Sequence, residues 1–173
     1  ATRILCISDL HIPFNLPIDI FASYKGIVDT IIINGDLLDC FSCSSFPKKF
    51  KVNLDEELVL GRQYIIDLIN MILPKKVVFT MGNHEYRMQR YYSDRLSNEL
   101  LGITPTDPLR MIIDKGFEVK DERNKTQTQY SSVREVFENT NIEIIYKQEW
   151  WIKEGNVIFC HPLNYSSGML KTT

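Results

Sequence analysis

Five short apolar runs rich in β-branched residues recur along the chain, and they restrict the fold more than any other feature of the sequence. Each run has a length typical of a buried strand and is bounded by polar or turn-forming residues. The runs cover residues 3–8, 28–33, 76–80, 142–146 and 156–160. The pattern predicts a chain built around β-sheet, with helices in the longer connections between strands.

Three segments between these runs carry helical signals. Asn53 or Asp55 can cap a helix that Pro74 ends. Apolar residues recur within it at helical spacing: Leu58, Ile65, Leu68, Ile69 and Ile72. A second helix is predicted from about Tyr86 towards Leu101, and a third over residues 131–139.

Strands that alternate with helices favour βαβ units with parallel pairing. After residue 140 the apolar runs are closely spaced, with a further one at 150–153, which suggests a second, partly antiparallel sheet. The predicted fold is α/β, with helices outside two central sheets. Residues 102–130, which contain Pro105 and Pro108, are predicted to be a surface excursion or cap with one short helix at most.

The composition is that of an ordinary globular protein. The 173 residues are 44% hydrophobic and 24% charged, and the mean hydropathy is −0.15. These values exclude a disordered, collagen-like or coiled-coil chain and predict a single domain over residues 1–173. The formal net charge of −2 provides no overall basic field for nucleic acid.

The sequence shows no secretory signal and no membrane span, so a cytoplasmic location is expected. The most apolar longer window, residues 64–73, is too short to cross a bilayer and carries Asp67 and Asn70. In a reducing cytosol free thiols are favoured. Cys40 and Cys43 have the CxxC spacing of a zinc site, but no second pair follows, so buried or loop thiols are the preferred interpretation.

Polar clusters follow four of the apolar runs, and they contain every histidine of the protein. A single cluster would indicate only a turn, but in open α/β sheets ligands bind outside the carboxyl ends of the strands. Four clusters that together hold the whole histidine complement predict a binding site there. The clusters are Asp9-Leu-His11, Gly35-Asp36-Leu-Leu-Asp39, Gly82-Asn83-His84-Glu85 and His161-Pro162.

The residue types in these clusters favour a transition-metal site. Carboxylate and amide oxygens with imidazole nitrogens, and no thiolate, suit Mn, Fe or Zn better than calcium or an iron–sulfur cluster. Asp36 is well placed to bridge two ions, because it has two oxygens and Gly35 before it leaves space. Two adjacent ions can clamp the attacking and leaving oxygens of a phosphoryl displacement. The sequence therefore predicts hydrolysis of a phosphate ester.

This ordered series of motifs, from residue 5 to 161, closely resembles the calcineurin-like metallophosphoesterases. The resemblance implies a four-layer α/β/β/α sandwich with a dinuclear centre between its sheets. It implies that Asp9, His11 and Asp36 hold one metal, whereas Asp36, Asn83 and His161 hold the other. It implies that His84 is no ligand but contacts the phosphate and protonates the leaving oxygen. Asp39 and Glu85 would orient these groups from outside.

The chain departs from the family pattern at two points. Where the family commonly has GDxxDR, this sequence has Cys40 in place of the arginine, and Arg87 or Arg90 is the candidate to compensate in binding substrate. The closing Gly-His-x-His motif is also missing, because no histidine follows His161. We therefore expect a C-terminally incomplete fold that lacks its last strands. Either a further segment or a second chain would supply the last metal ligands.

The leading prediction is a metal-dependent hydrolase of phosphate esters, acting on a phosphodiester, a nucleotide or nucleic acid. By the resemblance, a hydroxide activated by two divalent ions attacks and His84 is the general acid. Manganese is the expected metal, with iron, zinc and nickel as alternatives. A protein or small-molecule phosphomonoesterase is the alternative enzyme. A third hypothesis is a non-catalytic half or interaction module that needs a partner chain.

Three further features each allow two interpretations. Residues 86–95 interleave three arginines with three tyrosines, which is typical of an exposed helix but also of nucleic-acid binding. The basic residues of 47–51 predict a solvated loop that can also attract an anionic substrate. Trp150 and Trp151 are predicted to lie in the core, with stacking on substrate as the alternative.

Overall fold

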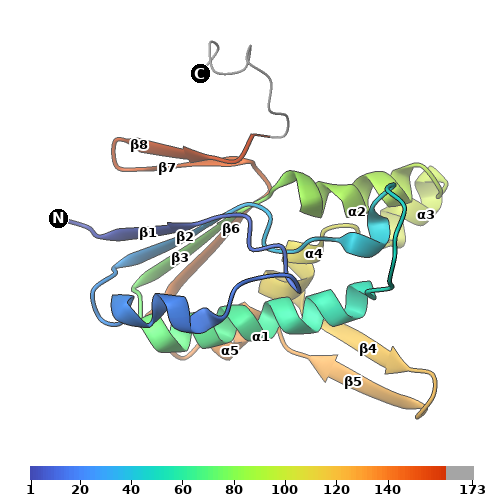
Figure 1. Cartoon of the computed structure of the whole chain (residues 1–173), viewed down its shortest axis with the longest axis horizontal. Coiled ribbons are helices and arrows are strands. Elements are labelled where there is room, and N and C mark those ends of the chain that lie inside the picture. Colours follow the sequence, from blue (N-terminus) through green and yellow to red (C-terminus); the bar gives the residue numbers. More distant parts are fainter. Residues whose placement is uncertain (163–173) are drawn as a thin grey trace.

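Four parallel strands form the central sheet, in the order β1-β2-β3-β6 (Figure 1). The structure, a computed structural model, describes residues 1–162, so the expected C-terminal incompleteness of the fold concerns a region outside the described residues. The strands are β1 (Ile4–Ile7), β2 (Thr30–Asn34), β3 (Lys76–Thr80) and β6 (Glu143–Lys147). The mixed α/β fold with a parallel sheet is confirmed.

The strand at residues 142–146 was placed in the wrong sheet by the sequence prediction. We expected it in a second sheet, but it runs parallel to β3 as the edge of the first. The second sheet is the antiparallel hairpin of β7 (Trp151–Glu154) and β8 (Val157–Cys160). The close spacing of the runs after residue 140 suggested that they share one sheet. However, β6 follows helix α5 (Val133–Val136), so it is the parallel strand of another helix-to-strand unit of the first sheet.

The two faces of the central sheet contact different layers. Alternate residues of β2 and β3 point to opposite sides, as in any strand. On one side Ile31, Ile33 and Phe79 join the large core cluster beneath helix α1 (Leu54–Ile72). On the other side Ile32 and Val78 pack against Ile152 of the hairpin, which covers that face (Figure 1). The complete four-layer sandwich remains a prediction.

The predicted helix over 86–101 is in fact two helices. Helix α2 (Asn83–Ser93) begins three residues earlier than expected, directly after Gly82. The side chain of Ser97 accepts a hydrogen bond from the backbone N–H of Leu100 and so starts α3 (Asn98–Ile103). Among the described residues there are also η1 (Ile18–Tyr24), η2 (Phe41–Cys43), α4 (Pro108–Arg110) and the π-helical turn η3 (Met111–Lys115).

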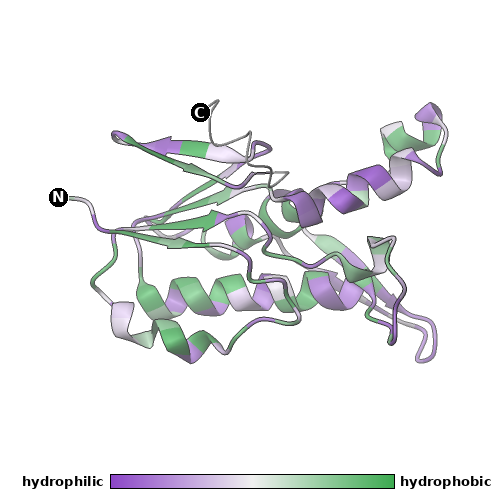
Figure 2. Cartoon of the chain, turned by 45° about the horizontal axis from the view of Figure 1, so that its top comes forward, coloured by the Kyte–Doolittle hydropathy of each residue, from purple (hydrophilic) through white to green (hydrophobic). Residues whose placement is uncertain are grey.

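The segment 102–130 is only partly the surface excursion that the sequence suggested. Leu109, Ile112 and Ile113 are fully buried in the main core cluster. After them β4 (Phe117–Asp121) and β5 (Thr126–Tyr130) form an antiparallel hairpin that was not predicted. Its mainly hydrophilic outer part projects away from the sheet (Figure 2).

Trp151 does not lie in the core, contrary to the prediction. Its side chain is 41% exposed, whereas Ile152 beside it is buried against the sheet. In a strand neighbouring side chains point to opposite faces, so the burial of Ile152 turns Trp151 outward. All four cysteines are free thiols. No helix in residues 1–162 is long and apolar enough to cross a membrane.

Candidate metal centre

The loops that follow β1 and β2 remain hydrogen-bonded to each other beyond the end of the sheet. The backbone N–H of Asp9 donates to Gly35 O at 3.2 Å, and that of His11 donates to Asp36 O at 3.0 Å. This pairing carries the side chains of Asp9 and His11 to the place where Asp36 leaves β2. The first two sequence motifs therefore meet because their strands are neighbours.

Three residues of these loops adopt the left-handed backbone region that favours glycine. The φ angles are +55° at Asp9, +49° at His11 and +54° at Asp36. Each such conformation costs about 1 kcal/mol or more in a residue with a Cβ. Strain of this kind persists where surrounding structure holds a site in a required geometry. Three strained residues on one small cluster mark it as a candidate functional site.

The motif glycines are required because other side chains approach them closely. A Cβ on Gly35 would lie 2.6 Å from Cγ of His161, and Gly35 also has a φ of +79°. A Cβ on Gly82 would collide with the backbone and carboxylate of Asp36. These glycines therefore allow His161 and the GNHE turn to pack directly against the Asp36 loop.

The side chain of Glu85 stabilises this packing of the two loops. Its side chain is completely buried and accepts hydrogen bonds from three backbone N–H groups, those of Asp36, Leu38 and Gly82, at 2.9–3.0 Å. One carboxylate thus joins the start of α2 to the loop after β2. Burial, and then the nearby Asp36 charge, raises the pKa of Glu85 to about 7 despite the donors around it.

Replacing Glu85 with alanine should destabilise the fold strongly. The change leaves three backbone donors without their acceptor, and each buried unsatisfied group costs about 1–3 kcal/mol. We expect Glu85→Ala to lose about 3 kcal/mol or more of unfolding free energy in urea titrations. Glu85→Gln, which keeps one accepting oxygen, should lose less. Glu99→Ala, at an exposed position of α3, is the control; equal losses for Glu85→Ala and Glu99→Ala would contradict this role.

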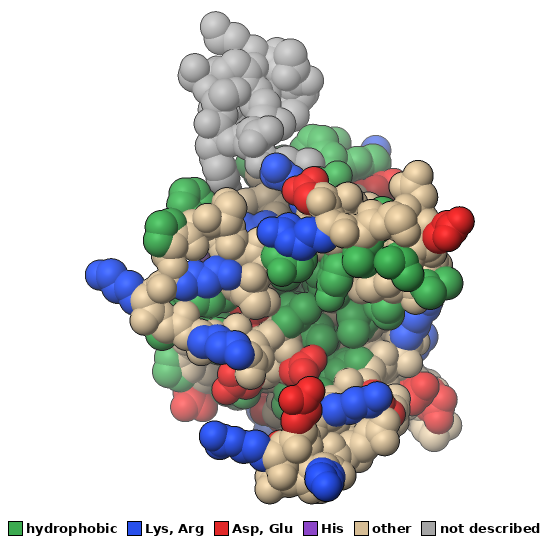
Figure 3. Space-filling model, turned by 90° about the vertical axis from the view of Figure 1, so that its right-hand side faces the viewer, with side chains coloured by type: hydrophobic (Ala, Val, Ile, Leu, Met, Phe, Trp, Pro, Cys, Tyr) green, Lys and Arg blue, Asp and Glu red, His purple; other side chains and the backbone are tan. Residues whose placement is uncertain are grey.

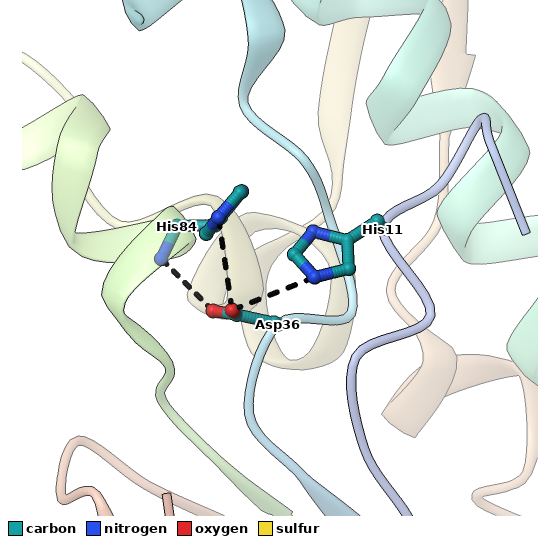
Figure 4. A group of neighbouring side chains, drawn as sticks. All are labelled: His11, Asp36 and His84. Atoms are coloured by element: carbon teal, nitrogen blue, oxygen red, sulfur yellow. Dashed lines mark hydrogen bonds and ion pairs between the residues drawn. The ribbon is translucent and has the colours of Figure 1, made fainter. Parts of the chain in front are cut away.

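The three histidines share one geometry around Asp36. In each, Nδ1 contacts an oxygen: Asp39 Oδ1 for His11 (3.2 Å), the Asp39 backbone O for His84 (2.9 Å) and Asn34 O for His161 (3.0 Å). In each, Nε2 faces Asp36 Oδ2, at 3.8, 3.9 and 3.3 Å respectively. Because oxygens of this kind only accept, Nδ1 carries the hydrogen and Nε2 presents its lone pair to the centre. Figure 4 shows His11 and His84 on either side of the carboxylate.

Electrostatics keep Asp36 and Asp39 ionised. Burial alone would raise the pKa of Asp36, but the ion pair that it can form with protonated His161 and the hydrogen bond from the His84 backbone outweigh burial, so the pKa is lowered. Burial also tends to raise the pKa of Asp39, but hydrogen bonds from His11 and His84 outweigh it, so this pKa is lowered well below its usual range. The hydrogen bond to Asp39 raises the pKa of His11, and that to Asp36 raises the pKa of His161. The cluster attracts cations.

The donor atoms are spaced as metal ligands are. They form two groups, within each of which the atoms lie within 4.8 Å of one another: His11, Asp36 and His84, and Asp9, Asp36 and His161. Asn83 adds an oxygen 3.1 Å from Nε2 of His161. Two donors about 3–4 Å apart can share one ion at bonds of about 2 Å. The residues present therefore fit two divalent ions that share Asp36.

Every residue predicted for the centre lies in or beside it, with two differences in grouping: Asp9 falls in the donor group of His161, and His84 joins that of His11. Asp9, His11, Asp36, Asn83 and His161 lie together, and Asp39 and Glu85 contact the backbone or rings that hold them. His84, predicted as a proton donor, is as close to Asp36 as His11 is. The geometry therefore permits either role for His84.

Arg87 contacts the backbone next to Cys40, the residue that stands where the family commonly has arginine. Its Nη1 donates to Asp39 O at 3.3 Å, next to Cys40, and its Nη2 donates to Nε2 of His84 at 2.8 Å. Cys40 itself is fully buried, so a long cationic side chain has no room there. Arg90, the other predicted substrate-binding arginine, lies one helical turn further and is exposed.

Two groups that support the site were not predicted. Asn34, at the end of β2, accepts from His161 and donates through Nδ2 to Cys160 O at 2.9 Å, which joins the two sheets beside the centre. Glu57 of α1 is buried and accepts from the N–H of Phe41 in the loop after Asp39. Burial raises its pKa to about 7. A polar residue directly before Gly35-Asp36, at the end of an apolar strand, was the available signal for Asn34.

The fold and the cluster define an α/β protein with a candidate two-metal site at the carboxyl ends of parallel strands. A family model described as calcineurin-like phosphoesterase matches residues 2–171, nearly the whole chain. The chain belongs to the calcineurin-like phosphoesterase family. Membership suggests metal-dependent hydrolysis of phosphoesters, and the family usually binds divalent metals. No curated protein and no solved structure matched the chain.

Proposed function

We propose that this chain hydrolyses phosphate esters with two divalent metal ions, preferably manganese, at the Asp36 cluster. The observation that carries the proposal is that one ionised carboxylate is shared by two groups of metal-capable donors. Asp9, whose Oδ1 also lies 3.6 Å from Nε2 of His11, would hold one ion with His11 and Asp36, and Asp36, Asn83 and His161 would hold the other. Bound ions of this kind make a water nucleophilic near neutral pH and neutralise charge on the phosphate.

Asp39 and Asn34 keep the imidazoles in the required tautomer. Asp39 contacts Nδ1 of both His11 and His84, and the Asn34 carbonyl contacts Nδ1 of His161. Orientation by such oxygens also increases the basicity of Nε2. The protein therefore orients the Nε2 lone pairs of His11 and His161 before an ion binds, whereas that of His84 accepts from Arg87.

Arg87 and His84 would act on the substrate together. In the structure Nε2 of His84 accepts from the Arg87 guanidinium, which can only donate. Donation of a proton from Nε2 to a leaving oxygen thus requires Arg87 to move off this nitrogen. An arriving phosphate would draw the guanidinium into a charge-assisted contact and release Nε2 for protonation.

The test is turnover with defined metal. The purified protein loaded with Mn²⁺ should hydrolyse bis(p-nitrophenyl) phosphate or p-nitrophenyl phosphate, and a chelator should abolish the reaction. Because protons compete with metal for His11 and His161, apparent Mn²⁺ affinity should rise as pH increases through the titration range of these histidines. The ratio of diester to monoester rates separates the diesterase from the phosphomonoesterase alternative.

Two other outcomes have different meanings. Failure to bind Mn²⁺ in calorimetry at any pH would contradict the proposed metal centre. Binding without turnover would instead favour the hypothesis that a further segment or partner chain carrying Gly-His-x-His completes the site. Restoration of turnover on addition of such a chain would then support that alternative.

A further inference from the structure

A cavity of about 500 Å³ shares Asn83 and Arg87 with the candidate site, and its other lining residues have no part in the chemistry described so far. Because Asn83 and Arg87 line it, and Arg87 also contacts His84, the cavity adjoins the candidate metal centre. One wall is helix α2, and the other is the end of η2 with the loop as far as Phe46. Its volume suits a small organic ligand such as a nucleotide.

One face of α2 supplies the long wall. Asn83, Tyr86, Arg87, Arg90 and Tyr91 all line the cavity. Their spacing of three and four residues places them on the same side of the helix. Of the three arginines and three tyrosines in residues 86–95, all except Tyr92 therefore line the cavity.

The charge of the cavity favours an anion. Arg87, Arg90 and Arg95 line it, opposed by the single carboxylate of Asp94. Arg95 is held in place, because its guanidinium lies 3.8 Å from the centre of the Tyr91 ring and donates to Tyr91 O. The protein as a whole is slightly acidic, with a net charge of −2, so this concentration of arginine is local.

Aromatic rings stand beside these cations. Tyr86 is 40% exposed and Phe46 is 74% exposed, although large aromatic side chains are usually more buried. They line the cavity from opposite walls. Figure 3, which looks onto this end of the molecule, shows hydrophobic side chains in the middle of the face and Lys and Arg side chains around them. Exposed rings between arginines are the arrangement by which proteins stack bases and hold phosphates.

We infer that the cavity along α2 binds a nucleotide unit of single-stranded nucleic acid, next to the phosphodiester that the metal centre would cleave. Arg90 and Arg95 contact the flanking phosphates, and Tyr86 stacks on a base. The inference rests on the proposed function only for the cleavage step, because binding itself depends on the cavity. It narrows the substrate class to nucleic-acid diesters.

The test measures binding without metal or turnover. Fluorescein-labelled hexathymidylate, and an abasic hexamer of equal charge, are titrated in EDTA at low salt and followed by fluorescence anisotropy. Hexathymidylate should bind about tenfold more tightly than the abasic hexamer, because stacking requires a base. Arg90→Ala should lower the affinity for hexathymidylate about tenfold and make that affinity less dependent on salt concentration. The matched control, Arg123→Ala, is exposed in the β4–β5 turn and should bind as the wild type does.

A base-specific variant separates stacking from charge. Tyr86→Leu should bind hexathymidylate with about tenfold lower affinity than the wild type and bind the abasic hexamer with unchanged affinity. Chemical-shift mapping should locate the oligonucleotide on α2 and residues 43–46. Because it uses the wild-type protein, this measurement does not depend on the folding of any variant. Equal binding of the two hexamers, or tighter binding of a phosphopeptide of equal charge, would overturn the inference. If the Mn²⁺-loaded protein then binds hexathymidylate and does not hydrolyse it, the result counts against the proposed function but not against the ligand of the cavity.

Discussion

The Asp36→Asn protein should bind Mn²⁺ far more weakly than the wild type and lose about 10³-fold in turnover of an aryl phosphate. Asp36 is the one residue shared by both groups of donors. Asparagine removes the negative charge and one of the two acceptor oxygens, so one carboxylate can no longer serve two ions. A loss of several kcal/mol of charge stabilisation corresponds to this change in rate.

The fold should survive this substitution. Oδ1 of Asp36 accepts from the backbone N–H of His84 at 2.9 Å, and the amide oxygen of asparagine can accept the same bond. Thermal melting should therefore show a small change, whereas calorimetry with Mn²⁺ should show a large one. Asp19→Asn, at an exposed position of η1, is the control for both. Unchanged stoichiometry and affinity for Mn²⁺ in Asp36→Asn would contradict a bridging role.

The parallel sheet and the meeting of the motifs could be predicted because both follow from local patterns. The run at 76–80 coincides with β3, and buried parallel strands are apolar on both faces. Carboxyl ends of neighbouring strands share one edge, which brings Asp9, Asp36 and Asn83 together without any knowledge of the loops.

The parts that were missed depend on contacts between distant residues. Strand β5 of the β4–β5 hairpin consists of threonine and glutamine residues followed by Tyr130. It therefore resembles a loop when only apolar runs are counted as strands. The burial of Leu109 follows from packing against the sheet, and Asp107 beside it accepts from Tyr146 OH at 2.6 Å. Neither contact leaves a signal within the segment itself.

In the site, residue identities were predictable but their partners were not. The Nδ1 atom of His161 is held by the backbone carbonyl of Asn34, and any residue type offers such a carbonyl. The contact of Arg87 with His84 requires both the early start of α2 and the chosen rotamer of a long side chain. Sequence motifs therefore named the candidate ligands, whereas the ring tautomers and the position of the Arg87 guanidinium depend on the three-dimensional structure.

The His84→Ala protein should retain Mn²⁺ and lose about 10³-fold in turnover of a substrate with a poor leaving group. A general acid contributes most where the departing oxygen is strongly basic. The loss should therefore be large for phenyl phosphate esters and much smaller for p-nitrophenyl esters, whose leaving group departs without a proton. Rates for a series of aryl esters, measured with Mn²⁺ at saturation, give this dependence directly.

The same experiment decides between the two roles that the geometry permits for His84. Nε2 of His84 lies 3.9 Å from Asp36 Oδ2, beside His11, so a ligand role would be lost together with an ion. Metal analysis of His84→Ala after gel filtration should then give fewer ions per chain, and all aryl esters should slow equally. Gln89→Ala, on an exposed position of the same helix, should match the wild type in both measurements. Full metal content with a steeper leaving-group dependence assigns His84 as the proton donor, because only a missing acid makes the rate depend more strongly on the basicity of the departing oxygen.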